Sequence, residues 1–187
     1  DPVGGARAHG AEATFVNVLE TERLVLRWLA PDDAPFMFEL VTDPTWIEFI
    51  GDRGLKTHED ARAYIVEKYV ASYLRHGFGL YAVTLKDSGT PVGICGLIKR
   101  DTLEDVDVGF AFLPRFAGLG YASESAAAVM AHERAERGIG RIVAITTPNN
   151  VRSIRVLEKV GLRFEKVFRM PGDDEELALY SHEPGRE

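Results

Sequence analysis

The chain has 187 residues, 45% of them hydrophobic and 27% charged, which is typical of one soluble globular domain. Its formal net charge of −7 disfavours a general nucleic-acid binder, which would need a basic face, and no apolar run approaches the roughly 18 residues of a membrane helix. The single cysteine, Cys95, cannot form an internal disulfide, and we therefore expect a reducing, cytoplasmic location and no membrane partner.

The N-terminal part predicts a tail followed by a strand and a helix. Residues 1–18 lack the apolar core of a secretion signal and are expected to form a flexible tail, before a single domain over 19–183. "RLVLRWL" (23–29) alternates and is rich in branched residues, which indicates a strand. Pro31 suits the first turn of a helix that follows this strand.

The next stretch predicts a connection and a second helix. "TDPTWIEFIGDRG" (42–54) holds prolines and glycines without a clear period and is predicted to be an irregular connection. Thr57 and Asp60 have the spacing of a capping box, in which each side chain bonds a backbone N–H near the other. They predict the start of a helix that Gly77 ends.

The remainder of the chain predicts six more strands and two helices. The strands are 78–86, 91–99, 105–113, 141–147, 163–169 and 176–182. One helix follows the third of these strands and runs to Gly138, and Asn150 caps another helix that Gly161 closes. The order β-α-α-β-β-β-α-β-α-β-β predicts an α/β (α+β) fold with a mixed, mostly antiparallel sheet of about seven strands around one β-turn-α-β unit.

The turn "PRFAGLGYASES" (114–125) places two glycines directly between a strand and a helix. Successive backbone N–H groups at such a junction form a concave anion site, to which the helix dipole adds about half a positive charge. A P-loop would need Gly-Lys-Ser/Thr where this chain has Gly120-Tyr121-Ala122, and a dinucleotide fold would need a third glycine at Ser123. The motif alone leaves two readings open: a site for another phosphate-bearing ligand, or glycines that serve packing alone.

Four stretches in order resemble the signatures of the GNAT superfamily of acetyl-CoA-dependent N-acetyltransferases, and are most similar to its ribosomal-protein alanine/serine N-acetyltransferase branch. They are "TERLVLRWLAPDDA", "GLYAVTLKDSGTPVGICGL", "DVGFAFLPRFAGLGYASES" and "NNVRSIRVLEKVGLRFE". The resemblance is collinear from about Thr21 to Tyr180. It implies acetyl-CoA as cosubstrate, a primary-amine acceptor and compatibility with a homodimer. The five histidines are scattered without metal-ligand spacing, so no metal is expected.

The resemblance also implies where the cosubstrate binds. The backbone of the strand before the turn would pair with the pantetheine arm, and the turn would bind the pyrophosphate in a register that starts at Ala117. The alternative register, which starts at Arg115, satisfies the family pattern literally. Asn150 would both cap its helix and bond pantetheine. The implied cosubstrate residues are Phe110, Ala111, Phe112, Ala117, Gly118, Leu119, Gly120, Tyr121, Ala122 and Asn150.

Two residues are candidates for acid–base chemistry. Many relatives place a tyrosine acid where this chain has Leu157, and the resemblance offers Ser153 as the donor to the leaving sulfur, beside the alternative of a plain helix serine. Asp107 lies where relatives often carry an acidic residue and is the candidate base. The alternatives are a merely solvated carboxylate, or action of Asp105 or Glu104 through water.

Three functions therefore remain open. The amine acceptor is a protein or peptide N-terminus, or it is a small amine such as an antibiotic or polyamine. The third reading is a non-catalytic acyl-CoA-binding module, which the unusual Ala117 and Leu157 favour. In the enzyme readings, Trp46, Phe49 and Tyr64 are candidate walls of the acceptor site.

Overall fold

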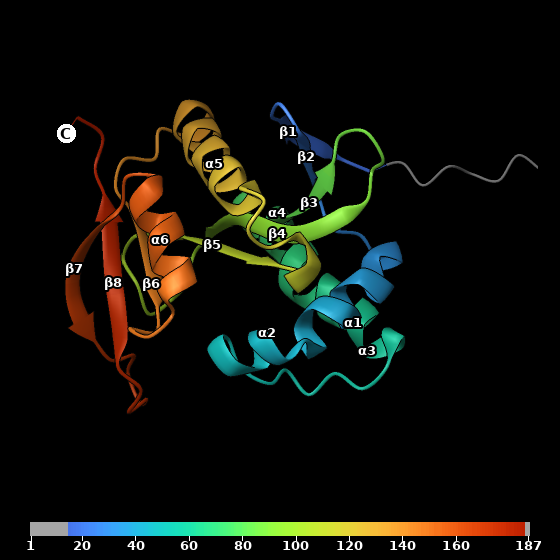
Figure 1. Ribbon diagram of the computed structural model, residues 1–187, viewed down its shortest axis with the longest axis horizontal. Helices are drawn as coiled ribbons and strands as arrows, with labels where there is room; N and C mark the ends of the chain where they lie inside the picture. The colour runs from blue at the N-terminus through green and yellow to red at the C-terminus, as the bar shows by residue number, and fades with distance from the viewer. Residues whose placement is uncertain (1–14, 186–187) are drawn as a thin grey trace, which may run out of the picture.

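The computed structural model describes residues 15–185 and contains one eight-stranded sheet with the order β1-β2-β3-β4-β5-β6-β8-β7 (Figure 1). The predicted mixed, mostly antiparallel α/β class is confirmed. The sheet has one strand more than the seven predicted, because β1 (Asn17–Glu20) pairs with β2. Residues 1–14 of the expected tail lie outside the described residues.

The strands form two antiparallel groups that meet at one parallel junction. The first group is β1, β2 (Leu24–Arg27), β3 (Leu80–Leu85), β4 (Pro91–Ile98) and β5 (Val106–Phe112). The second group is β6 (Ile142–Thr146), β8 (Leu177–His182) and β7 (Arg163–Phe168). Among the strands of residues 15–185 only β5 and β6 run parallel, which fits the predicted β-turn-α-β unit.

The helices before β3 include one that the sequence analysis missed. The 3-10 turn η1 (Pro31–Asp33) leads into α1 (Ala34–Thr42). The connection predicted to be irregular contains α2 (Pro44–Phe49), so that prediction is wrong over these residues. Asp43 caps α2 by accepting the Thr45 N–H, and the ring of Pro44 fits the first helical position.

The second predicted helix is confirmed at both ends. Thr57 and Asp60 make the capping box at the start of α3 (His58–Tyr64), and Gly77, at φ +79°, ends α4 (Ala71–His76). Between these two helices the π-helical segment η2 (Ile65–Val70) widens the turns. After β5 come the 3-10 turn η3 (Pro114–Phe116), α5 (Tyr121–Arg137) and, beyond β6, α6 (Val151–Lys159).

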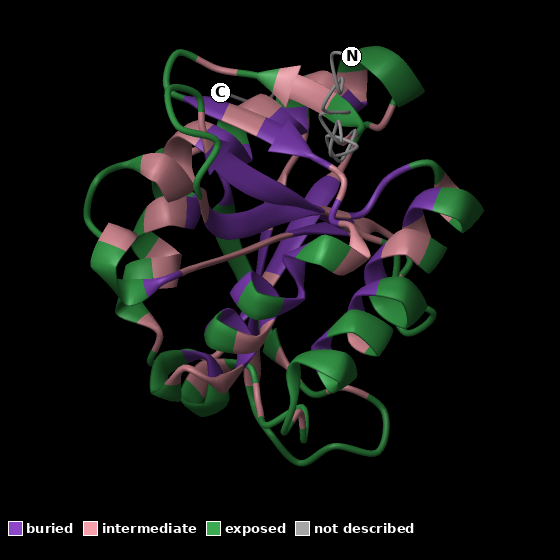
Figure 2. Ribbon diagram, turned by 90° about the vertical axis from the view of Figure 1, so that its right-hand side faces the viewer, coloured by how far each residue is buried: buried purple, intermediate pink, exposed green. Residues whose placement is uncertain are grey.

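The core lies between the sheet and its covering helices, and the strands at its centre are buried (Figure 2). Helix α5 packs on β4 and β5, and it contacts α6. The fully buried side chains at the centre are mostly aliphatic: Leu24, Leu26, Ile94, Leu97, Ile142 and Leu157. Among residues 15–185, no helix combines the length and the apolar character needed to cross a bilayer.

Candidate active site

The parallel junction between β5 and β6 is short. Its register contains only Val106 opposite Ile142 and Asp107 opposite Val143, although β5 continues to Phe112. On its other edge β5 stays paired with β4 from Asp107 to Phe112, with Phe110 opposite Cys95 and Phe112 opposite Gly93. The two parallel strands therefore separate after Asp107, and β5 presents an edge of backbone groups that have no β6 partner.

A buried polar atom lies directly beyond the other strand of this junction. Thr147 follows β6, and its Oγ1 is buried with no hydrogen-bond partner among the described residues. Buried polar atoms are nearly always paired, and an orphaned one calls for an explanation. A polar ligand between the separating strands would satisfy it. Phe110, Ala111 and Phe112, predicted to hold pantetheine, lie on the β5 side of the same separation.

The predicted glycine loop, residues 117–122, joins the end of β5 to α5. Gly118 and Gly120 both have left-handed backbones, at φ +77° and +84°, which favour glycine. No hydrogen bond within residues 15–185 uses the amide of Gly118, Leu119 or Gly120 as donor. The first amides of α5, which starts at Tyr121, also have no intrahelical acceptor. The loop is thus a group of unpaired donors at the positive end of a helix, which suits an anion.

The side chains at the start of the loop supply no hydrogen-bond donor for an anion, so the donors are backbone N–H groups. Ala117 is exposed and carries no polar group. Arg115, the first residue of the alternative register, forms an ion pair with Glu39 of α1. Its guanidinium is therefore engaged away from the loop, and the anion-binding capacity of residues 117–122 comes from their main chain.

Asp107 is a buried acid in an ion pair. It is only 2% exposed, and its Oδ1 lies 3.0 Å from Arg100 Nε. Burial raises the pKa of Asp107, while the charge and hydrogen bond of Arg100 lower it. The alternative of a merely solvated carboxylate is wrong for this residue. An acid that is desolvated and held by one cation has the features of a functional carboxylate.

The side chain of Asp107 lies on the face of the sheet opposite α5. Phe110 is opposite Cys95, whose thiol lies beside Ser125 of α5, so Phe110 shares the α5 face. Side chains alternate along a strand, and Asp107, three positions earlier, belongs to the other face. There it neighbours Ile98 across the β4–β5 pair. The acid is thus presented away from the helix that carries the glycine loop.

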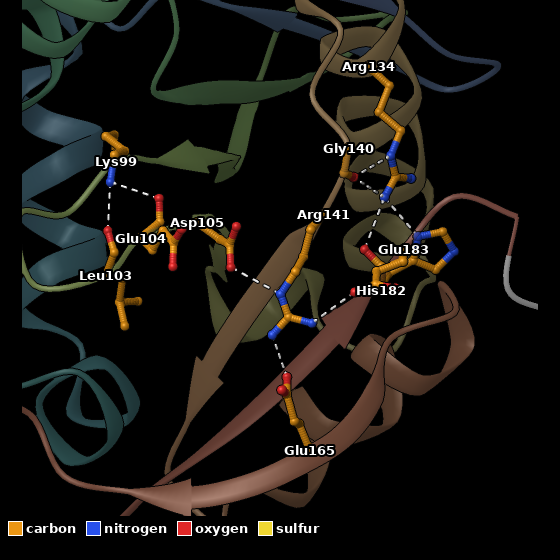
Figure 3. A network of polar contacts seen from close by, with 10 residues as sticks. All are labelled: Lys99, Leu103, Glu104, Asp105, Arg134, Gly140, Arg141, Glu165, His182 and Glu183. Atoms are coloured by element: carbon orange, nitrogen blue, oxygen red, sulfur yellow. Dashed lines mark hydrogen bonds and ion pairs between the residues drawn. The ribbon is translucent and has the colours of Figure 1, made fainter.

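Of the two neighbouring acids, Asp105 has a carboxylate that is bound elsewhere, as Figure 3 shows. Asp105 Oδ2 lies 3.0 Å from Arg141 Nε, and Arg141 also contacts Glu165 at 2.5 Å and Glu183 at 3.5 Å. The backbone oxygen of Glu104 accepts a hydrogen bond from Lys99 Nζ at 3.1 Å. Asp105 is therefore part of a separate cluster around Arg141.

Lys99 also organises the connection that delivers Arg100 to Asp107. Its Nζ donates to the carbonyls of Leu103 and Glu104 at 2.6 and 3.1 Å (Figure 3). It also donates to the carbonyl of Arg100 at 3.2 Å. The Lys99 ammonium thus holds three carbonyls of the β4–β5 connection together. Sequence reasoning missed Arg100, because no periodicity or motif marks a residue that acts across a seven-residue turn.

Ser153 and Asn150 lie together at the start of α6. Asn150 Oδ1 accepts the backbone N–H of Ser153 at 3.2 Å, as the predicted cap requires. The Ser153 side chain is half-buried, and its hydroxyl has no hydrogen bond among the described residues. Leu157, where relatives have the tyrosine, is 1% exposed and belongs to the core. The free hydroxyl at this end of β6 is compatible with a donor role.

The predicted acceptor walls lie on the helices before β3. Trp46 of α2 is 6% exposed, and its indole Nε1 has no hydrogen-bond partner among the described residues. Tyr64 of α3 meets Tyr69 of η2 edge to face, with ring centroids 5.5 Å apart. Phe49 ends α2. Within residues 15–185 no three His, Cys, Asp or Glu side chains gather as a metal-binding group.

Comparisons with known proteins agree on one family. A model of the acetyltransferase (GNAT) domain matches residues 23–163. The uncharacterised N-acetyltransferase YnaD of Bacillus subtilis is 28% identical over 151 residues, which are 81% of this chain and 85% of that protein. A GNAT-family acetyltransferase from Bacillus anthracis has a crystal structure with a TM-score of 0.74 and 28% identity, covering 91% of this chain and 98% of that one.

A further solved structure shares the fold at low identity. RimL, a ribosomal L7/L12 alpha-N-protein acetyltransferase in complex with coenzyme A, has a TM-score of 0.76 and 17% identity, covering 89% of this chain and 97% of that one. The family expected from four sequence signatures is confirmed, since the family model matches most of the chain. The chain belongs to the GNAT family, and it is an acetyltransferase.

Proposed function

We propose that the protein transfers an acetyl group from acetyl-CoA to a primary amine, and that this amine is the N-terminal α-amine of a protein or peptide. The observation that carries the proposal is the separation of β5 from β6 beside a loop of unpaired amides. A small antibiotic or polyamine is the alternative acceptor. RimL, whose fold is similar, is a protein acetyltransferase that was solved with coenzyme A, which supports the choice of cosubstrate.

The residues present fit acetyl-CoA. The amides at the start of α5 suit its diphosphate, and the unpaired edge of β5 suits the amide groups of its pantetheine arm. The orphaned Thr147 Oγ1 would gain a partner there. When bound, acetyl-CoA supplies an activated acyl group as a thioester. No metal is needed to hold any of these groups.

The chain's own residues would then divide the work of acyl transfer. An N–H of Phe110, Ala111 or Phe112 that faces the separation would donate to the carbonyl oxygen as it gains negative charge. Asp107, held by Arg100, would remove a proton from the amine directly or through water. Ser153 would donate to the departing sulfur. An α-amine needs modest help, because its pKa of about 8 leaves a sizeable neutral fraction.

The test of this function is a transfer screen read by mass. Purified protein is incubated with acetyl-CoA and matched panels of N-terminal peptides, polyamines and aminoglycosides, and an increase of one acetyl group is sought in each. We expect acetylation of peptides with a free N-terminus, and none of the same peptides blocked at that amine. Turnover confined to polyamines or aminoglycosides would favour the small-amine reading. Acetyl-CoA binding without turnover on any amine would favour the non-catalytic module.

Replacement of Ser153 by alanine tests its role as donor to sulfur. Because Asn150 accepts the backbone N–H of Ser153, the alanine variant keeps the helix cap. We expect kcat to fall by about 100-fold with acetyl-CoA affinity and melting temperature unchanged. The matched control is Ser88→Ala in the exposed β3–β4 turn, which should behave as the wild type. An unchanged kcat in Ser153→Ala would leave this serine as a helix residue only.

A further inference from the structure

The turn before β2 contacts the glycine loop, although the two segments lie about a hundred residues apart. Thr21 Oγ1 donates to Glu124 Oε2 at 2.6 Å, and the Arg23 backbone N–H donates to the same oxygen at 3.2 Å. Arg23 Nε lies 2.8 Å from Glu124 Oε1. Glu124 is in the first turn of α5. The first sequence signature, "TERL", thus binds the helix whose start forms the candidate anion site.

Arg23 also binds the loop itself. Its Nη1 donates to the carbonyl oxygen of Leu119 at 2.9 Å, and its guanidinium lies over the Tyr121 ring, 4.5 Å from the centroid. In a trans peptide the C=O and N–H point in opposite directions, and no cis peptide occurs in the described chain. Because the Leu119 carbonyl is held toward Arg23, the Gly120 N–H is turned to the opposite side. Arg23 therefore fixes the direction of one donor of the loop.

The same guanidinium compensates a charge that opposes anion binding. Partial burial raises the pKa of Glu124, but hydrogen bonds from Thr21 and Arg23 outweigh this and leave it below its ordinary value, so the side chain is ionised. An uncompensated carboxylate one helical turn from the loop would repel a diphosphate. The Arg23–Glu124 ion pair removes most of that repulsion.

We propose that Arg23 is a positioning residue for the cosubstrate: it orients the Leu119–Gly120 peptide and neutralises Glu124, so that the loop can receive the diphosphate of acetyl-CoA. This inference rests on the proposed function. It gives the first signature a role in binding, because the side chain of Arg23 acts through the loop's main chain. Arg23 also fixes the direction of a loop peptide, which the apolar side chain of Ala117 cannot do.

The experiment compares Arg23→Met, Glu124→Gln and the double variant in the full chain. Calorimetry gives the Kd of acetyl-CoA, and steady-state kinetics give kcat and both KM values. We expect Arg23→Met to raise the acetyl-CoA Kd and KM about tenfold, while kcat and the amine KM stay within twofold. Glu124→Gln should bind at least as tightly as the wild type. The double variant should stay weaker than Glu124→Gln, because the peptide anchor is still missing.

The control is Arg169→Met, which breaks another exposed Arg–Glu pair, with Glu176 at 3.4 Å beyond β7, and should leave every parameter unchanged. An acetyl-CoA Kd within twofold of the wild type in Arg23→Met would overturn the inference while the proposed function stands. A wild type that does not bind acetyl-CoA would overturn both. If Arg23→Met does not fold, the acetyl-CoA Kd of Arg23→Gln is measured instead and judged by the same twofold limit.

Discussion

Gly120→Asp is expected to weaken acetyl-CoA binding by about a hundredfold or more, since one added charge near a diphosphate costs several kcal/mol at an effective dielectric of about 20. A Cβ at this position would lie 3.2 Å from Arg23 Nη2, where φ is +84°. The new carboxylate would compete with the Leu119 carbonyl for that guanidinium and place negative charge at the start of α5. The measurement is titration calorimetry with acetyl-CoA.

Gly138→Asp is the matched control for this variant. Gly138 also has a left-handed backbone, at φ +65°, and it ends the same helix that Gly120 begins. The substitution therefore introduces similar backbone strain and the same charge, but about 25 Å away along a helix of 17 residues. It should lower the melting temperature and leave acetyl-CoA affinity intact. Binding by Gly120→Asp within twofold of the wild type would remove the diphosphate from this loop.

Asp107→Asn should lower kcat by about a hundredfold, the size expected when a general base is lost. The amide keeps the shape of the buried side chain but cannot accept the proton of the ammonium. Acetyl-CoA affinity should change little. Asp105→Asn is the control, because that carboxylate is bound by Arg141. Should Asp105→Asn prove the slower of the two, the base has been assigned to the wrong residue.

The pH dependence gives a second reading of Asp107. A base acts when ionised, so activity falls as the pH drops through its pKa. Because burial raises the pKa of Asp107, the acid limb of kcat/KM should lie above the ordinary range for aspartate. Arg100 lowers that pKa and Lys99 does so to a smaller extent, so Arg100→Gln should move the limb to higher pH. A limb that stays in place would show that Asp107 does not govern it.

The fold was predictable where local signals decide the structure. The capping box at Thr57 and the glycine that ends α4 depend on a few neighbouring residues, and the structure has both. Helix α2 carried a readable signal in Asp43–Pro44, but six residues are too few for helical periodicity to stand out. Strand β1 is only four residues long, and it forms because β2 offers it a partner.

The candidate site was predictable in its backbone and less so in its side chains. Gly118 and Gly120 indicate the loop in the sequence, since left-handed backbones favour glycine. Partners from distant segments could not be read in the same way. Glu39 engages Arg115, and Arg100 reaches Asp107 through a turn whose shape depends on the Lys99 ammonium. Such pairs arise from tertiary packing, which one sequence does not encode in a local pattern.

The short β5–β6 register has a consequence for how the molecule holds together. Two rungs join the half-sheet of β1–β5 to that of β6–β8, and the contact of α5 with α6 is a further link between the halves. A ligand that pairs with the free edge of β5 would add contacts that hold the two half-sheets together. By linkage it would add about 2.7 kcal/mol of stability at a hundredfold excess over its Kd. Cosubstrate saturation and resistance to heat should therefore rise together in this enzyme.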